Sequence, residues 1–167
     1  AGPVGVMVLV GMLNVAATIG AGAAARRLAG DLFALAVTAA VALLVHSHGA
    51  VKLVDPWNPW VTVLPLLCYL LCLPAAVVHR SRWALAVALV TGSFAAQSHL
   101  GNLPVVLAAA VVATAWWWWD RSRFPTARTE RSGPRPAWWI PLLAMGLWAG
   151  PLVDLVVNAP GNLWHLA

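Results

Sequence analysis

Long apolar runs, separated by short polar or basic segments, follow one another along the whole chain. Each run approaches the roughly 20 residues of helix that cross the hydrocarbon layer of a membrane, which is about 30 Å thick. The pattern predicts an all-α fold, a polytopic transmembrane helical bundle that forms a single domain over residues 1–167. The expected spanning helices are approximately 3–24, 30–47, 61–78, 83–99, 103–119 and 138–157.

The composition excludes most classes of soluble protein. Hydrophobic residues make up 62% of the chain and charged residues only 9%, whereas soluble domains are about 25% charged. The net charge of +5 does not indicate a nucleic-acid partner, because the basic residues form no surface stripe of the kind that nucleic-acid binding requires. Cys68 and Cys72 are four residues apart in one apolar run and are interpreted as packing residues. The expected partner is membrane lipid.

The distribution of basic residues predicts the orientation. Arg26 and Arg27, the HRSR segment at 79–82 and the 120–137 loop lie in alternate connections, and every basic residue except Lys52 falls in one of them. Because cytoplasmic loops are enriched in Lys and Arg, we expect these three connections to be cytoplasmic. The protein is then a multi-pass protein of the plasma (inner) membrane, with both ends of this chain outside.

Tryptophans flank the 120–137 loop on both sides. Trp116 to Trp119 precede it, and Trp138 and Trp139 follow it. Indole rings favour the headgroup level of a membrane, so these residues are interpreted as interfacial anchors. The chain begins at Ala1 with a helix that enters from the outside, without a recognisable cleavable signal. We therefore expect the sequence to be a fragment that lacks an N-terminal part.

Under this orientation the polar side chains gather on the outer side, while the helix middles hold little beyond Asn14 and some Ser and Thr. A secondary transporter would place ionisable groups or broken helices near the middle of the bilayer. An enzyme for a lipid-linked substrate needs its polar groups at one interface, so the asymmetry favours an enzyme. The outer residues are His46, His48, Lys52, Asp55, Trp57, Asn58, Trp60, Gln97, Ser98, His99, Asn102, Asp154, Asn158, Asn162 and His165.

Several of these residues have a purely structural alternative. Gln97 and His99 could satisfy the last carbonyl groups of their helix, with Asn102 as a turn residue. Asp154 lies inside an apolar run, where a carboxylate indicates either function or a structural partner such as His99 or Lys52. His46 and His48 are two residues apart and point in different directions on a helix, so no metal site is predicted. No cofactor is predicted either.

Three segments carry a resemblance to a known family. They are DPWNPW at 55–60, GSFAAQSHLGN at 92–102 and GPLVDLVVNAPGNL at 150–163. In these segments the chain resembles actinobacterial multi-spanning glycosyltransferases of the C-type fold, the group related to protein mannosyltransferases and arabinofuranosyltransferases. It departs from their pattern at Asn102, where an aromatic residue is expected, and at Gly150 and Leu155, where Pro and Gln are usual.

The resemblance implies transfer of a sugar from a polyprenyl-phosphate donor to an acceptor on the outer face of the membrane, in the cell envelope. The catalytic carboxylate of such enzymes lies in the first outer loop, which is expected upstream of Ala1, so no catalytic residue is assigned here. A transporter or flippase-like protein and a structural membrane subunit are the alternatives. The candidate substrate-binding residues are Trp57, Asn58, Gln97, His99, Asn102, Asp154 and Asn162.

These candidates are expected to form one site. The QSHLGN segment, the 55–60 loop and the 158–165 tail lie at the same predicted membrane level and carry most of the polar side chains. A concave site with a few convergent polar groups is the usual form of a ligand site. We therefore expect the three segments to converge in one depression on the outer face.

Overall fold

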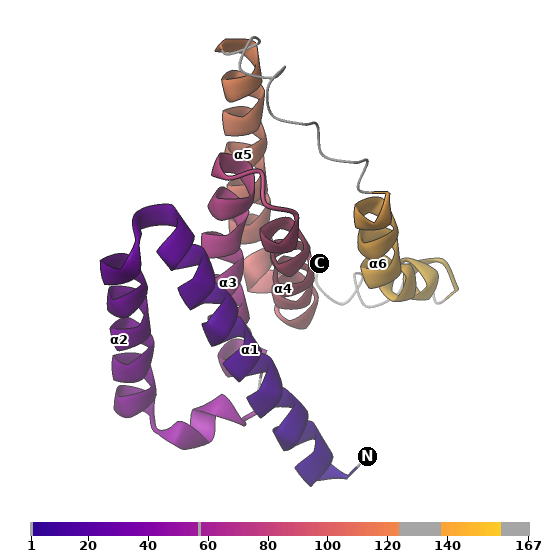
Figure 1. Cartoon of the computed structure of the whole chain (residues 1–167). Coiled ribbons are helices and arrows are strands. Elements are labelled where there is room, and N and C mark those ends of the chain that lie inside the picture. The colour runs from indigo at the N-terminus through magenta and orange to yellow at the C-terminus, as the bar shows by residue number, and fades with distance from the viewer. Residues whose placement is uncertain (1, 57, 124–137, 158–167) are drawn as a thin grey trace. The chain divides into compact units, whose positions relative to one another are not determined.

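The structure, a computed structural model, describes residues 2–56, 58–123 and 138–157. The prediction of an all-α fold is confirmed, and no strand occurs within those ranges. The chain divides into two units, residues 1–133 and 134–167, which are described separately. The helices of the first unit (Figure 1) are α1 (Pro3–Ala29), α2 (Asp31–His48), η1 (Ala50–Leu53), α3 (Asn58–Val78), α4 (Arg82–Ser98), η2 (Leu100–Asn102) and α5 (Leu103–Arg123).

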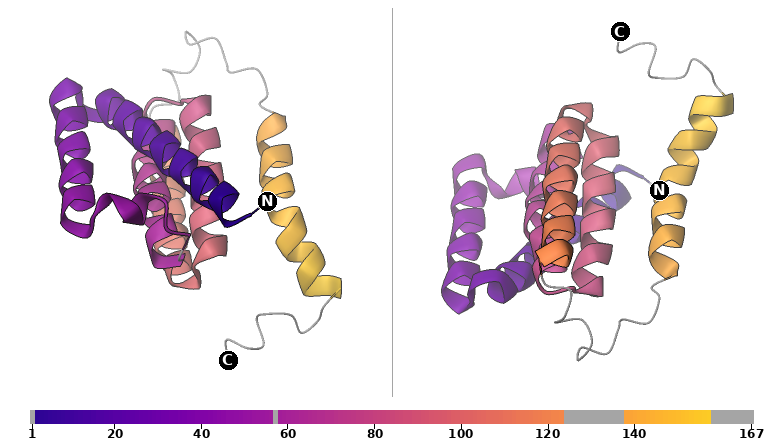
Figure 2. Two further views of the ribbon diagram at one scale, coloured as in Figure 1. Left: turned by 90° about the horizontal axis from the view of Figure 1, so that it is seen from below. Right: turned by 90° about the horizontal axis from the view of Figure 1, so that it is seen from above.

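Helix α3 is the centre of the first unit. It packs against α1, α4 and α5, whereas α2 packs against α1 and η1. Two views of the ribbon show α2 at the outside of this unit, with α1 between it and the other helices (Figure 2). Helix α3 contains Pro65 and Pro74, and such interruptions are tolerated inside membrane helices when neighbouring groups satisfy the freed backbone.

Small side chains form the contacts between α1, α3 and α4. On α1 the buried positions follow one another at intervals of three or four residues, with Ala24 and Ala25 both after Ala21, which places them on one face of the helix: Val10, Asn14, Ala17, Ala21, Ala24 and Ala25. A Cβ atom on Gly20 would lie 2.8 Å from the sulfur of Cys68, and one on Gly92 would lie 2.6 Å from the ring of Tyr69. Glycine and alanine therefore let these backbones approach closely, as in membrane helix pairs.

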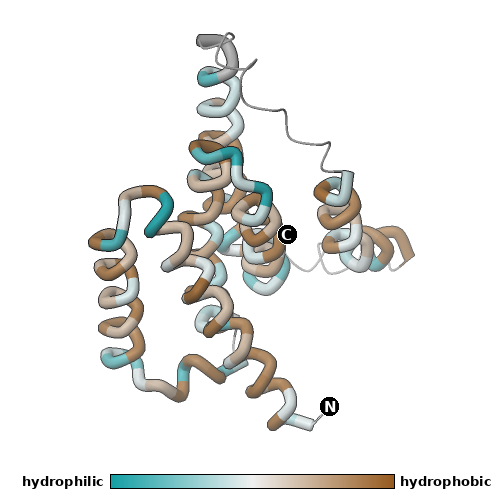
Figure 3. The backbone as a smooth tube through the Cα atoms, viewed as in Figure 1, coloured by the Kyte–Doolittle hydropathy of each residue, from teal (hydrophilic) through white to brown (hydrophobic). Residues whose placement is uncertain are grey.

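Large apolar side chains point away from this core. Leu32 and Leu43 of α2 are 80% and 68% exposed, and Val41 is the only residue of that helix that is buried among those described. Apolar residues dominate α1 and α2, and polar residues gather near the turns (Figure 3). A helix that is hydrophobic all round and still uncovered is typical of a membrane span. The protein is membrane-embedded.

Four helical segments of the described chain are long and apolar enough to cross a membrane: Pro3–Ala29, Asp31–His48, Pro59–Val78 and Leu100–Asp120. Helix α4, predicted as a span at 83–99, has 17 residues. The second unit holds α6 (Trp139–Val157), predicted at 138–157, whose apolar part is Trp139–Asp154. The six helices are confirmed, and six membrane crossings stay a prediction.

Two arginine-rich turns and the end of α5 meet at one end of the first unit, called here the arginine end and defined by Arg26, Arg27, Arg80 and Arg82. The guanidinium of Arg27 donates to the hydroxyl of Ser81 over 3.4 Å, which joins the α1–α2 and α3–α4 turns. Arg80 pairs with Asp120 near the end of α5 at 3.3 Å. The predicted common level of these connections is thus supported by contacts, while the side of the membrane they face stays a prediction.

Candidate binding site at the histidine end

The opposite end of the first unit, called here the histidine end, is defined by His48, Lys52, Asp55 and His99. Helices α1 to α5 alternate in direction, so α2 and α4 finish at this end and α3 and α5 begin there (Figure 1). Figure 3 shows the same segments with polar residues at the turns. The two ends of the unit therefore differ in their cations: guanidinium groups, some paired with Asp31 and Asp120, define one end, and the ammonium of Lys52 and the imidazoles of His48 and His99 define the other.

The segment after α2 folds back onto α1. Gly49 has a φ of +85°, a left-handed conformation that glycine adopts without strain, and its N–H donates to the carbonyl of Val45. The chain then forms η1, and the side-chain N–H of Asn14 donates to the carbonyl of Leu53 over 2.8 Å. Asn14 is only 3% exposed. A buried amide in the apolar run of α1 thus holds η1 in place.

The indole ring of Trp60 lies next to two basic side chains beside η1. The ammonium of Lys52 lies 5.0 Å from the ring centre of Trp60. The imidazole of His48 lies 4.9 Å from the same ring, at an interplanar angle of 58°. Lys52 also pairs with the carboxylate of Asp55 at 3.3 Å. A cation over an indole face is attracted by the ring quadrupole, so Trp60 helps fix the position of Lys52.

A small cavity of about 30 Å³ lies behind this cluster. Its wall includes Asn14, whose Oδ1 atom is buried and has no hydrogen-bond partner among the described residues. A buried amide oxygen without a donor is costly. The cavity is large enough for one small hydrogen-bonding molecule such as water. The other lining residues are Leu44, Val45, His48, Gly49, Lys52, Leu53, Trp60, Val63 and Leu64.

The QSHLGN turn adopts the geometry of a helix end. The backbone N–H of His99 donates to the carbonyl of Ala95 over 3.2 Å, and the side-chain N–H of Asn102 donates to that carbonyl over the same distance. The N–H of Asn102 also donates to the carbonyl of His99. Asn102 therefore ties off α4, which is the structural alternative for that residue. The side chains of Gln97 and His99 are exposed at the histidine end.

The structure describes only some of the residues that were predicted to converge in one depression. Trp57 and Asn162 lie outside the described residues, and Asn58 begins α3 without a described side chain. Asp154 is exposed on α6, in the other unit. Of the predicted site residues, Gln97, His99 and Asn102 lie together in one turn at the histidine end. The depression formed with the 158–165 tail stays a prediction.

Asn14, His48, Lys52 and Trp60 were not predicted as one site. The last three were recognised as outer polar residues, and Asn14 as a polar residue in the middle of a helix. The available signal was Asn14 itself, since an amide in an otherwise apolar run needs a partner from elsewhere in the fold. The partner, Leu53, is 39 residues away, and only the fold-back of η1 brings it there.

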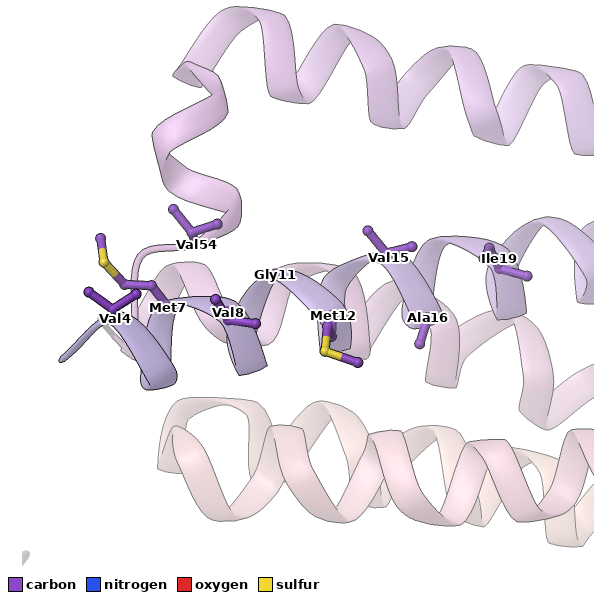
Figure 4. Close-up of a pocket in the computed structure, with 9 residues that line it drawn as sticks. All are labelled: Val4, Met7, Val8, Gly11, Met12, Val15, Ala16, Ile19 and Val54. Atoms are coloured by element: carbon purple, nitrogen blue, oxygen red, sulfur yellow. The ribbon is translucent and has the colours of Figure 1, made fainter. Parts of the chain in front are cut away.

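An apolar groove of about 520 Å³ runs along α1 toward the same region (Figure 4). Val54, which follows η1, forms one end of its wall, and the rest comes from α1. Methyl and thioether groups line the groove, so it is suited to a hydrocarbon chain. The residues from α1 are Val4, Met7, Val8, Gly11, Met12, Val15, Ala16 and Ile19.

No family model, curated protein or solved structure matches this chain. Among the described residues, the histidine end offers an ammonium group (Lys52), three imidazoles (His46, His48 and His99), a carboxylate (Asp55) and an indole (Trp60), beside an apolar groove. Such a set can bind an amphiphile with an anionic headgroup and a hydrocarbon tail.

Proposed function

We propose that this chain is the transmembrane part of a glycosyltransferase that takes a sugar from a polyprenyl-phosphate donor and transfers it at the histidine end of the bundle. This end is proposed to face outside. The proposal rests on the resemblance in the segments 55–60, 92–102 and 150–163, and on the placement of the polar groups in the first unit.

The observation that carries the proposal is the separation of polar and apolar chemistry along the helices. In residues 2–56 and 58–123, every Lys, Arg, Asp and His lies in a turn or within the first or last turns of a helix. An ion-coupled transporter would need ionisable groups at middle depth. An enzyme acting on a lipid-linked substrate needs polar groups at a membrane interface, beside a surface that accepts the lipid chain, and the apolar groove along α1 lies beside the histidine end.

The reaction assigns a different task to each group. An acceptor hydroxyl oxygen attacks the anomeric carbon, the bond from that carbon to the phosphate oxygen breaks, and the phosphate leaves with the electron pair. The hydroxyl proton passes to a carboxylate base, which is not assigned to a residue of this chain. Lys52 is suited to stabilise the leaving phosphate, and His99 to donate a hydrogen bond to it. The apolar groove along α1 is suited to the isoprenoid chain.

The test compares histidines that differ in their contacts. In the complete protein, in membranes, sugar transfer from polyprenyl-phosphate donors is measured per amount of folded protein. His99→Ala and Lys52→Ala are expected to lower the normalised rate by roughly 100-fold, the effect typical of losing one positioned donor to developing charge. His46→Ala is the control, because His46 is exposed near the same end but belongs to neither the Lys52–Trp60 cluster nor the QSHLGN turn.

Equal normalised rates for His99→Ala, Lys52→Ala and wild type would contradict the proposal and leave these residues with a structural role only. Lipid movement across the membrane without sugar transfer by the wild-type protein would favour the flippase alternative instead.

A further inference from the structure

The arginines of the arginine end are not equivalent. Arg26 pairs with Asp31 at 2.6 Å, and Arg80 pairs with Asp120 at 3.3 Å. Arg27 has no carboxylate within 4.0 Å in the part of the chain that the structure describes. Two neighbouring arginines on α1 therefore carry the same charge, but only one of them has its charge compensated by the fold.

Arg27 is nevertheless held in place. Its guanidinium carbon lies 5.0 Å from the ring centre of Trp83, and one nitrogen donates to Ser81 over 3.4 Å. Stacking on an indole face orients a guanidinium and leaves its edge free. A guanidinium has five N–H donors, and the fold uses one of them here. Arg27 is exposed, so the remaining donors are accessible.

The unused N–H donors of Arg27 and their level in the membrane indicate what kind of ligand Arg27 would bind. A planar guanidinium binds phosphate oxygens in a bidentate manner. Arg27 lies at the end of α1, which is long and apolar enough to cross a membrane, and contacts Trp83. At this level indole rings are favoured and phospholipid phosphates are found. Basic groups at this level attract anionic lipids, with about 1 kcal/mol for each Lys or Arg near the surface.

We propose that Arg27, oriented by Trp83, binds the headgroup phosphate of an anionic phospholipid at the arginine end. The site joins the α1–α2 turn to the α3–α4 turn through Ser81, so the lipid would bridge two connections of the bundle. The proposal is independent of the sugar-transfer function.

The experiment uses a matched pair of neighbours. The purified protein, in detergent with equal amounts of phosphatidylglycerol and phosphatidylcholine, is analysed by native mass spectrometry for retained lipid. Arg27→Gln is expected to lower phosphatidylglycerol retention about fivefold, the ratio that corresponds to about 1 kcal/mol. Arg26→Gln removes the same charge from a residue already paired with Asp31, and is expected to change retention by less than twofold. Trp83→Leu should reproduce the loss, and Trp83→Phe should retain most of the binding.

Two outcomes would overturn the proposal. Equal losses in Arg26→Gln and Arg27→Gln would show attraction by net charge without a site. Displacement of the lipid by millimolar inorganic phosphate or glycerol phosphate would show a site for free anions. Thermal unfolding of each variant controls for folding, and Arg27→Lys replaces Arg27→Gln if the latter does not fold. That variant keeps the charge without the guanidinium fork, so unchanged retention would also contradict the proposal.

Discussion

The hydroxyl of Tyr69 donates a 2.7 Å hydrogen bond to the backbone carbonyl of Val106, 37 residues further along the chain. Tyr69 lies in the middle of α3, and Val106 lies near the start of α5. The ring of the same tyrosine packs on Gly92 of α4. One side chain of α3 thus contacts both α4 and α5 and helps fix their relative height.

Removing this hydroxyl should loosen α5. Tyr69→Phe keeps the ring on Gly92 and loses only the hydrogen bond, so we expect a decrease in the free energy of unfolding of about 0.6 to 1.7 kcal/mol, the range for hydrogen bonds between membrane helices. Unfolding in mixed detergent micelles would measure it. The control is Thr38→Val, because the hydroxyl of Thr38 donates only within its own helix, to Ala34. An equal effect of the two variants would contradict the role of Tyr69 between helices.

The close approach of α3 and α4 makes Gly92 sensitive to a single methyl group. Gly92→Ala places a Cβ 2.6 Å from the Tyr69 ring, and overpacking of this kind costs about 1 to 3 kcal/mol. Gly22→Ala adds the same methyl group to α1 where no atom lies within 4 Å, and it should stabilise the helix by about 0.5 to 1 kcal/mol. Opposite signs are expected in the unfolding midpoints, and a stabilising Gly92→Ala would refute the close packing.

Asn14 should control the mobility of η1. Asn14→Ala removes the donor to Leu53 and leaves a half-buried carbonyl without its partner, which costs about 1 kcal/mol. We expect faster amide hydrogen exchange in residues 50–54. Thr18→Ala is the control on the same helix, because the Thr18 hydroxyl donates only to the carbonyl of Asn14. Unchanged exchange in 50–54 would show that other contacts hold η1.

The two ends of the bundle should be accessible from opposite sides of the membrane. In intact cells an impermeant maleimide is expected to label His46→Cys at the histidine end, and to label Ser132→Cys in the 120–137 loop only after permeabilisation. The native Cys68 and Cys72 are fully buried and should give little background. Ready labelling of Ser132→Cys in intact cells would reverse the predicted orientation.

The helices could be predicted from sequence because each apolar run is long and is bounded by arginines, glycines or prolines. Bounds were less predictable: α1 continues through Arg26 and Arg27 to Ala29, since arginine is a good helix former and Gly30, with a φ of +84°, is the residue that ends it. The sequence also predicted that the arginine-rich connections lie at one end of the bundle, because alternate turns of antiparallel helices must share one end.

The cluster around Trp60 could not be predicted in the same way. Its members come from α1, α2, η1 and α3, and their meeting depends on the turn at Gly49 and on the pairing of Asn14 with Leu53. Periodicity places a residue on a face of its own helix and says nothing about which distant carbonyl that face will meet. For Asn102, sequence left capping and ligand binding open, and the bond to Ala95 now supplies the capping partner.

The small residues between α1, α3 and α4 have a consequence for sequence variation in this protein. The buried positions include Ala17, Ala21, Ala84 and Ala88, while bulky residues such as Leu32 and Leu43 face outward. Exchanges among Leu, Ile, Val and Phe on the outward faces keep the surface apolar and should be neutral. Enlarging an inward alanine to leucine should separate the helices. In this bundle a change from one hydrophobic residue to a larger one would be most damaging at the buried alanines. The exposed bulky positions would accept other large apolar residues without loss of stability.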